Sequence, residues 1–132
     1  MIVAAFARSI AIPFEKWRDF SGRAERKEFW SFFLFCLIGE LLLLALDVTL
    51  DLYFPAIEDG LFSALFSLVT FVPLVAVITR RLHDVGKSGW LQLIIFVPFI
   101  GFVVLLTFWL RGSQPRANEY GSQVTMSGRE HR

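Results

Sequence analysis

The segment RRLHDVGKSGW, residues 80–90, contains the residues of this 132-residue chain that are the strongest candidates for a catalytic or binding role. It contains His83 with Asp84 directly after it. A His–Asp pair that activates a nucleophile needs a third residue in reach, and Ser88 lacks the Gly-x-Ser-x-Gly surroundings of a hydrolase elbow. The first glycine of a phosphate-binding loop would stand where the chain has Arg81. We therefore predict no catalytic residue in this segment.

Helical spacing instead predicts local ion pairs within residues 80–90. Arg80 and Asp84 are four residues apart and can pair on one helix face, and His83 has Lys87 at the same spacing. The predicted structure is a cytoplasmic hinge between membrane helices whose bases contact lipid phosphate. The alternative is a binding site for an anionic group such as a lipid headgroup. The candidate residues are Arg80, Arg81, His83, Asp84, Lys87 and Trp90.

A second group of candidates is acidic and lies within an apolar run. Glu40 and Asp47, followed by Asp51, fall close to one line along a helix at about 100° per residue. An ionisable group at membrane depth is a functional hypothesis by default, here a route for protons or cations. The structural alternative is a hydrogen bond from Glu40 to a neighbouring helix, with Thr70 as the candidate partner.

Three apolar runs must position these residues: 29–50, 61–79 and 90–110. Apolar residues make up 55% of the chain, above the 45–50% or so of soluble domains. Each run reaches the roughly 20 residues that a membrane-spanning helix needs. Pro98 and Gly101 interrupt the third run. We favour a third crossing there, with a re-entrant hairpin as the alternative.

Polar segments flank this membrane domain, residues 29–110. In the N-terminal segment, 1–28, the aromatic residues of FEKWRDF (14–20) recur every three positions, which predicts a short helix in the membrane interface. The tail, 111–132, is polar, and we expect its last dozen residues to be disordered. The predicted fold is an all-α membrane protein with a short interfacial N-terminal helix and three transmembrane helices.

The distribution of basic residues predicts the orientation of the chain. Six precede the first run, none lies in the loop 51–60, and three lie in 80–89. Since Lys and Arg in short loops favour the cytoplasm, the N-terminus is predicted to be cytoplasmic. The juxtamembrane bases are Arg23, Arg26 and Lys27.

Four segments carry a resemblance to a known family. They are FSGRAERKEFW (20–30), RRLHDVGKSGW (80–90), PFIG (98–101) and NEYG (118–121). In this order, separated by apolar runs, they resemble the family of small bacterial inner-membrane proteins known as the domain of unknown function numbered 805. The resemblance covers roughly residues 14–121. It implies a multi-pass protein of the bacterial inner (plasma) membrane, and it implies no reaction.

Three functions remain open, and we rank a structural or adaptor protein with anionic-lipid contacts first. Its partners would be membrane lipids, further copies of the chain or another membrane protein. An oligomeric transporter or channel component that uses the line of acids from Glu40 comes second, and an enzyme that acts on lipid through residues 80–90 comes third. Two histidines and the single Cys36 give no metal-ligand spacing, so we expect no metal and no cofactor. A net charge of +1 and bases that flank apolar runs argue against nucleic acid as a partner.

Overall fold

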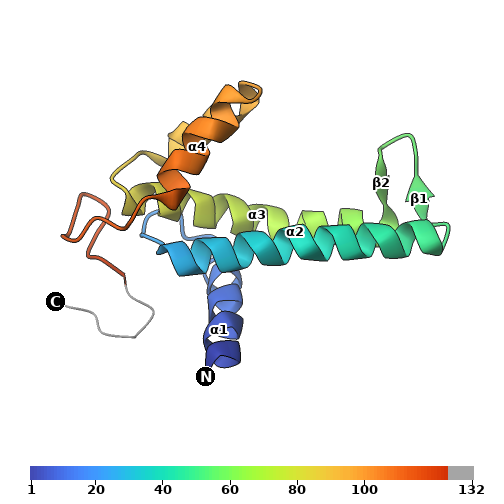
Figure 1. Cartoon of the computed structure of the whole chain (residues 1–132), viewed down its shortest axis with the longest axis horizontal. Helices are drawn as coiled ribbons and strands as arrows, with labels where there is room; N and C mark the ends of the chain where they lie inside the picture. Colours follow the sequence, from blue (N-terminus) through green and yellow to red (C-terminus); the bar gives the residue numbers. More distant parts are fainter. Residues whose placement is uncertain (125–132) are drawn as a thin grey trace.

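Two long antiparallel helices, α2 (Arg26–Thr49) and α3 (Leu61–Asp84), form the body of the molecule (Figure 1). Each has 24 residues and is therefore about 36 Å long, enough to cross the hydrocarbon of a bilayer. The computed structural model describes residues 1–124, and within them these are the two helices long and apolar enough to cross a membrane. They correspond to the first two predicted spans, and α3 continues beyond position 79 to include the charged residues that follow.

A small hairpin connects the two helices at one end. Strand β1 (Tyr53–Phe54) pairs antiparallel with β2 (Asp59–Gly60), directly before α3 begins. The side chain of Asp47, near the end of α2, accepts hydrogen bonds from the backbone N–H groups of Phe62 and Ser63. The first turn of α3 is thus capped from the preceding helix rather than from its own N-cap residue.

The N-terminal helix is formed by residues that mostly precede the predicted segment 14–20. Helix α1 spans Ile2–Glu15 and packs against α2 and α3, whereas residues 16–18 form a turn. The prediction of a helix over 14–20 is therefore wrong. The reason is local, because Asp19 accepts hydrogen bonds from the backbone N–H groups of Ser21 and Gly22 and holds the chain in a turn.

The third apolar run is not one helix. It folds into a 3-10 helix, η1 (Gly89–Phe96), and a short helix, α4 (Ile100–Leu110), which pack against each other as a hairpin. Phe99 at the bend has a positive φ of 62°. A Cβ atom at Gly101 would lie 1.8 Å from the Ile94 carbonyl oxygen, so only glycine permits this close approach of the two limbs. The prediction of a continuous helix over 90–110 is therefore wrong.

The buried core lies where the start of α2, the end of α3 and the end of α4 meet. Its members are Ala24, Phe29, Phe32, Val77, Leu82, Leu105 and Trp109. Farther along α2 and α3 the large apolar side chains point outward; Leu42 and Leu68, for example, are 66% and 73% exposed. Such apolar exposure on two adjacent helices fits contact with lipid.

Residues 111–124 of the tail return to this end of the molecule, as do the starts of η1 and of α2 (Figure 1). Residues 125–132, most of the stretch predicted to be disordered, lie outside the described residues, and that prediction stays a prediction.

Candidate functional site

Asp84, at the end of α3, is the centre of a buried polar cluster. Arg23 Nε donates to its Oδ1 at 3.0 Å, and Arg81 Nη1 and the Ser113 hydroxyl donate to its Oδ2. Asp84 and both arginine side chains are completely buried. Both carboxylate oxygens are therefore engaged by partners from three separate parts of the chain.

Arg80 pairs with α2 rather than with its own helix. Its Nη1 donates to Glu28 Oε1 at 2.5 Å, and this pair is also buried. The predicted pair of Arg80 with Asp84 is wrong, because α3 directs Arg80 toward α2 and Asp84 toward Arg23 and Arg81. We call the five charged residues Arg23, Glu28, Arg80, Arg81 and Asp84 the ion-pair cluster. Within residues 1–124, Nε and Nη2 of Arg80 have no hydrogen-bond partner.

Arg23 also holds the tail in place. Its guanidinium donates to the carbonyl oxygens of Gln114 at 2.7 Å, Arg116 at 3.0 Å and Gly121 at 3.2 Å. In return, the Gln114 N–H donates to the backbone carbonyl of Asp84 at 3.0 Å. Arg23 thus contributes three charge-assisted hydrogen bonds that hold the tail against the ion-pair cluster.

His83 connects the N-terminal loop with the tail. Its Nδ1 lies 2.9 Å from the Gly22 carbonyl oxygen, so Nδ1 carries a proton and donates a hydrogen bond to this oxygen. The ring stacks on Tyr120, with centroids 3.8 Å apart and planes 2° from parallel. Burial, together with the neighbouring Glu119, raises the pKa of the Tyr120 hydroxyl. Lys87, the predicted neighbour of His83, instead lies over the ring of Phe108.

The remaining bases of the predicted motifs, Arg26, Lys27 and Lys87, are exposed around the last turn of α4, together with Arg111 of the tail. Arg26 Nη1 donates to the Leu110 carbonyl oxygen at 3.2 Å, and Lys27 borders a shallow hollow with Leu110. Lys87 and Arg111 lie over the ring of Phe108, at 5.6 Å and 4.8 Å. We call these exposed residues the basic surface: Arg26, Lys27, Lys87 and Arg111. The predicted orientation of Arg80 and Arg81 toward lipid phosphate is wrong, since both are completely buried.

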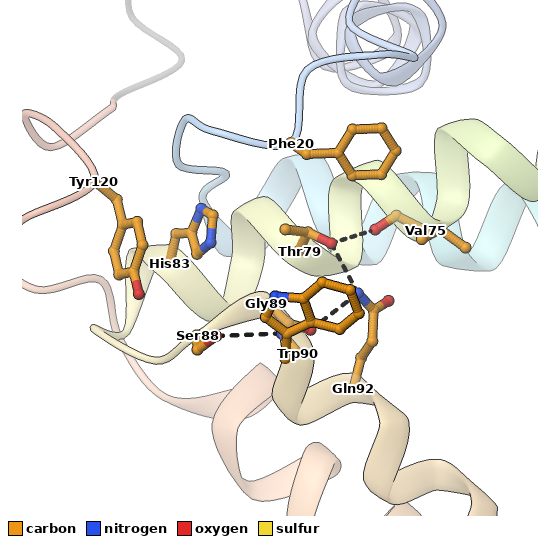
Figure 2. Close-up of a pocket in the computed structure, with 9 residues that line it drawn as sticks. All are labelled: Phe20, Val75, Thr79, His83, Ser88, Gly89, Trp90, Gln92 and Tyr120. Carbon is orange, nitrogen blue, oxygen red and sulfur yellow. Dashed lines mark hydrogen bonds between the residues drawn. The ribbon is translucent and has the colours of Figure 1, made fainter.

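A hollow of about 480 Å³ opens beside His83, between α3 and the start of η1 (Figure 2). We call it the interfacial hollow; its polar lining comes from Thr79, His83, Ser88, Gln92 and Tyr120, with Trp90 beside them. Thr79 and Gln92 are hydrogen-bonded at 2.9 Å, and the Ser88 hydroxyl accepts from the Trp90 N–H at 3.3 Å. Across residues 1–124 no hydrogen bond joins His83 to Ser88.

The two acids predicted to lie within the membrane, Glu40 and Asp47, have separate structural contacts. Asp47 is completely buried and caps α3, accepting also from the Ser63 hydroxyl at 2.8 Å. Glu40 accepts a hydrogen bond from the Ser67 hydroxyl at 2.8 Å, across the α2–α3 interface. Its predicted partner Thr70 instead donates to the backbone carbonyl of Phe66 on its own helix.

Of the ion-pair cluster, sequence reasoning missed only Glu28, but it also missed the tail residues that contact the cluster. Glu28 stands in the segment FSGRAERKEFW (20–30), and the tail residues surround NEYG, but neither segment has spacing that points to α3. The structure also brings together no group of three or more His, Cys, Asp or Glu side chains suited to a metal ion within residues 1–124.

Comparison with known proteins identifies the relatives of this chain. Inner membrane protein YhaI of Escherichia coli K12 is 42% identical over 103 residues, which cover 78% of this chain and 83% of the relative. Inner membrane protein YhaH of the same strain is 36% identical over 102 residues, which cover 77% and 84%. No solved structure matches the chain. A family model described as "Protein of unknown function (DUF805)" matches residues 17–122, so the chain belongs to this family, as its motifs predicted.

Proposed function

We propose that the chain is a multi-pass protein of the bacterial inner membrane that binds anionic phospholipid at its cytoplasmic surface and acts as a structural or adaptor protein without turnover. The observation that carries this proposal is the division of the motif charges into two sets. The ion-pair cluster is buried and engages protein groups, whereas the basic surface is exposed around the end of α4. The names of the relatives and the two long apolar helices support the membrane location.

The basic surface has the composition of a headgroup site. Its four cations surround Phe108 and Leu110, next to the half-buried Trp30, whose indole N–H donates to the Trp109 carbonyl oxygen. Amphipathic rings and long basic side chains are typical of the membrane–water interface. Each base near an anionic leaflet contributes about 1 kcal/mol of attraction.

We infer that α2 and α3 cross the bilayer and that the η1–α4 hairpin is re-entrant from the cytoplasmic side. Each limb is about 16 Å long, roughly half of the 30 Å of hydrocarbon. The hydrogen bonds of Gln114, Arg116 and Gly121 to Arg23 favour a tail on the same side as the N-terminal loop. All thirteen Lys and Arg residues of the sequence then lie in the cytoplasm, in keeping with the positive-inside rule.

Lipid retention tests the proposed headgroup site. The full chain is reconstituted in nanodiscs of mixed phosphatidylglycerol and phosphatidylcholine, and retained lipids are counted by native mass spectrometry. Arg26→Gln with Lys27→Gln is expected to weaken phosphatidylglycerol retention about thirty-fold, the equivalent of about 2 kcal/mol. The control, Arg8→Gln with Arg18→Gln, removes the same charge away from α4 and is expected to leave retention unchanged. Equal losses in both variants would contradict a specific site.

The contacts of the acids favour this function over a transporter or channel component. Asp47 caps α3, and Glu40 is hydrogen-bonded to Ser67. These two acids therefore have separate structural roles. An enzyme acting through residues 80–90 is disfavoured because Asp84 is fully occupied by Arg23 and Arg81 and does not contact His83 through its side chain.

A further inference from the structure

The molecule is much broader at one end of the α2–α3 body than at the other. At the end that holds the ion-pair cluster, α1 runs roughly perpendicular to α2, and α4 leaves the body obliquely on the opposite side (Figure 1). At the far end, the described chain adds only the short hairpin of β1 and β2 to the two helices. The two ends therefore need different areas in the plane of a membrane that α2 and α3 cross.

The first turns of α1 project from the body and are apolar on all sides. Phe14, near the other end of this helix, packs edge-on against Phe32 and Phe35 of α2, with ring centroids 5.2 Å and 6.0 Å apart. Residues 2–7, by contrast, are Ile, Val, Ala, Ala, Phe and Ala, and all of them are exposed. A projecting segment without a polar side chain is suited to hydrocarbon rather than to water.

The η1–α4 hairpin exposes its apolar side chains most strongly at the bend. Phe96, Phe99 and Ile100 are 79%, 88% and 64% exposed, and residues 89–110 contain no Asp, Glu, Lys or Arg. Each limb is about 16 Å long, roughly half of the hydrocarbon thickness, so a hairpin that starts at one surface ends at or before the midplane. The bend is therefore suited to contact the acyl chains of one leaflet only.

We propose that the protein is a one-sided wedge that concentrates in curved membrane, an inference that rests on the re-entrant topology proposed above. Helix α1 and the η1–α4 hairpin displace lipid from the cytoplasmic leaflet on opposite sides of the body, whereas the other leaflet accommodates little beyond α2 and α3. Bending relieves this difference when the cytoplasmic leaflet is on the convex side, because the convex leaflet has the larger area. Membrane binding by helices that insert into one leaflet depends on curvature for the same reason.

Membrane tubes pulled from giant vesicles test the wedge with the full chain. The protein, in a Cys36→Ala background, is reconstituted in both orientations in phosphatidylcholine with a minor fraction of phosphatidylglycerol. An impermeant dye added outside labels Ser88→Cys only in copies whose cytoplasmic side faces outward, and Glu58→Cys only in copies of the opposite orientation. Because the outer leaflet of a tube is convex, the dye at position 88 should be enriched about three-fold over the flat membrane, and the dye at position 58 depleted about three-fold.

Two double substitutions test which end of the molecule responds to curvature. Val3→Gln with Phe6→Gln makes the projecting turns of α1 polar, and Phe54→Gln with Ile57→Gln makes the same kind of change at the far end of the body. Phe6 and Phe54 are both 48% exposed, and Val3 and Ile57 are also exposed, so both variants leave the core intact and remove similar apolar surface. We expect the first variant to reduce the enrichment of the position-88 dye about two-fold and the second to cause no reduction.

A wedge must respond to its orientation, so equal enrichment or equal distribution of the two dyes would overturn the proposal. Equal distribution together with paired fluorophores would show that a second copy of the chain, rather than lipid, covers these surfaces. The same dye distinguishes a failure of the topology: it would then reach Ser122→Cys in copies whose position 88 is protected, and both proposals would fall. If positions 88 and 122 lie on one side and no enrichment occurs, the topology holds and the wedge is wrong. The lipid-retention assay tests the basic surface independently.

Discussion

Arg23 and Asp84 are 61 positions apart in the sequence, yet Arg23 Nε and Asp84 Oδ1 lie 3.0 Å apart and both side chains are completely buried. This pair connects the loop before α2 with the end of α3. Arg23 contacts three carbonyl groups of the tail through the same guanidinium. A single side chain, that of Arg23, therefore joins three segments that the apolar runs keep far apart in sequence.

Breaking this pair is expected to be far more destabilising than the loss of a surface ion pair. Asp84→Asn should lower the free energy of unfolding by about 3–5 kcal/mol, because it leaves Arg23 and Arg81 buried with an uncompensated charge. The matched control is Arg8→Gln, which removes an exposed pair with Glu15 at 2.9 Å and should change stability by less than about 1 kcal/mol. Unfolding in mixed micelles, followed by tryptophan fluorescence, measures both. If both substitutions lower the free energy of unfolding by similarly small amounts, Asp84 does not form the buried ion pairs described above.

The proposed re-entrant insertion of the η1–α4 hairpin makes a direct prediction about topology. In a Cys36→Ala background, single cysteines at Ser88 and Ser122 should be protected from a membrane-impermeant reagent in intact cells, and a cysteine at Glu58 should be labelled. Permeabilised cells provide the control, in which all three should react. Labelling of the Ser122 position from outside would instead mean three crossings.

Capping by Asp47 is expected to be essential for the first turn of α3. Asp47→Ala leaves the N–H groups of Phe62 and Ser63 without an acceptor and should destabilise the protein by about 2 kcal/mol, at the upper end of capping effects because the site is buried. Asp51→Asn, four residues later, is the control and should change little, because Asp51 is exposed and Asn tolerates its positive φ of 59°. The same fluorescence assay compares them, and equal losses would rule out a capping role.

The hydrogen bond between Glu40 and Ser67 predicts different outcomes for two substitutions. Glu40→Gln keeps an acceptor of similar shape and should accumulate normally, whereas Glu40→Lys should fail to accumulate because it places an unpaired cation within the bilayer. Ser67→Ala should cost about 0.6 kcal/mol, the average for such bonds in membranes. Quantitative immunoblotting of membranes measures abundance. If Gln and Lys reduce it equally, the carboxyl has a role that this hydrogen bond does not explain.

Asp19 predicts a pH dependence of the N-terminal loop. Burial alone would raise the pKa of its carboxyl, but hydrogen bonds from the Ser21 N–H, the Ser21 hydroxyl and the Gly22 N–H lower it below its ordinary 3.8. The folded state thus releases this proton more readily than the unfolded state. Its stabilising contribution is complete above the unfolded pKa and is lost as the pH falls through the folded pKa. As the pH is lowered from about 5 to 3, the melting temperature should fall less in Asp19→Asn than in the parent protein. Identical pH profiles would exclude this contribution.

The sequence alone determined the features that depend on neighbours along the chain. The long, mostly apolar runs at 29–50 and 61–79 predicted helices that the structure has as α2 and α3, because a stretch of such length can satisfy its backbone in lipid only as a helix. Pro98 and Gly101 marked where the third run could bend, although the continuous helix was the favoured interpretation. The motifs also identified the family correctly.

Only the tertiary structure decided which charges meet. Helical spacing offered Asp84 as the partner of Arg80, but spacing compares residues on one helix and contains no information about what packs against it. Once α2 and α3 lie side by side, Glu28 reaches Arg80, and Arg23 reaches Asp84. Burial follows from the same packing, since the tail and the η1–α4 hairpin enclose Arg81 through the carbonyl groups of Trp109 and Arg111. Whether an arginine faces lipid or protein is therefore a property of the assembled helices, because it depends on contacts between segments that are distant in the chain.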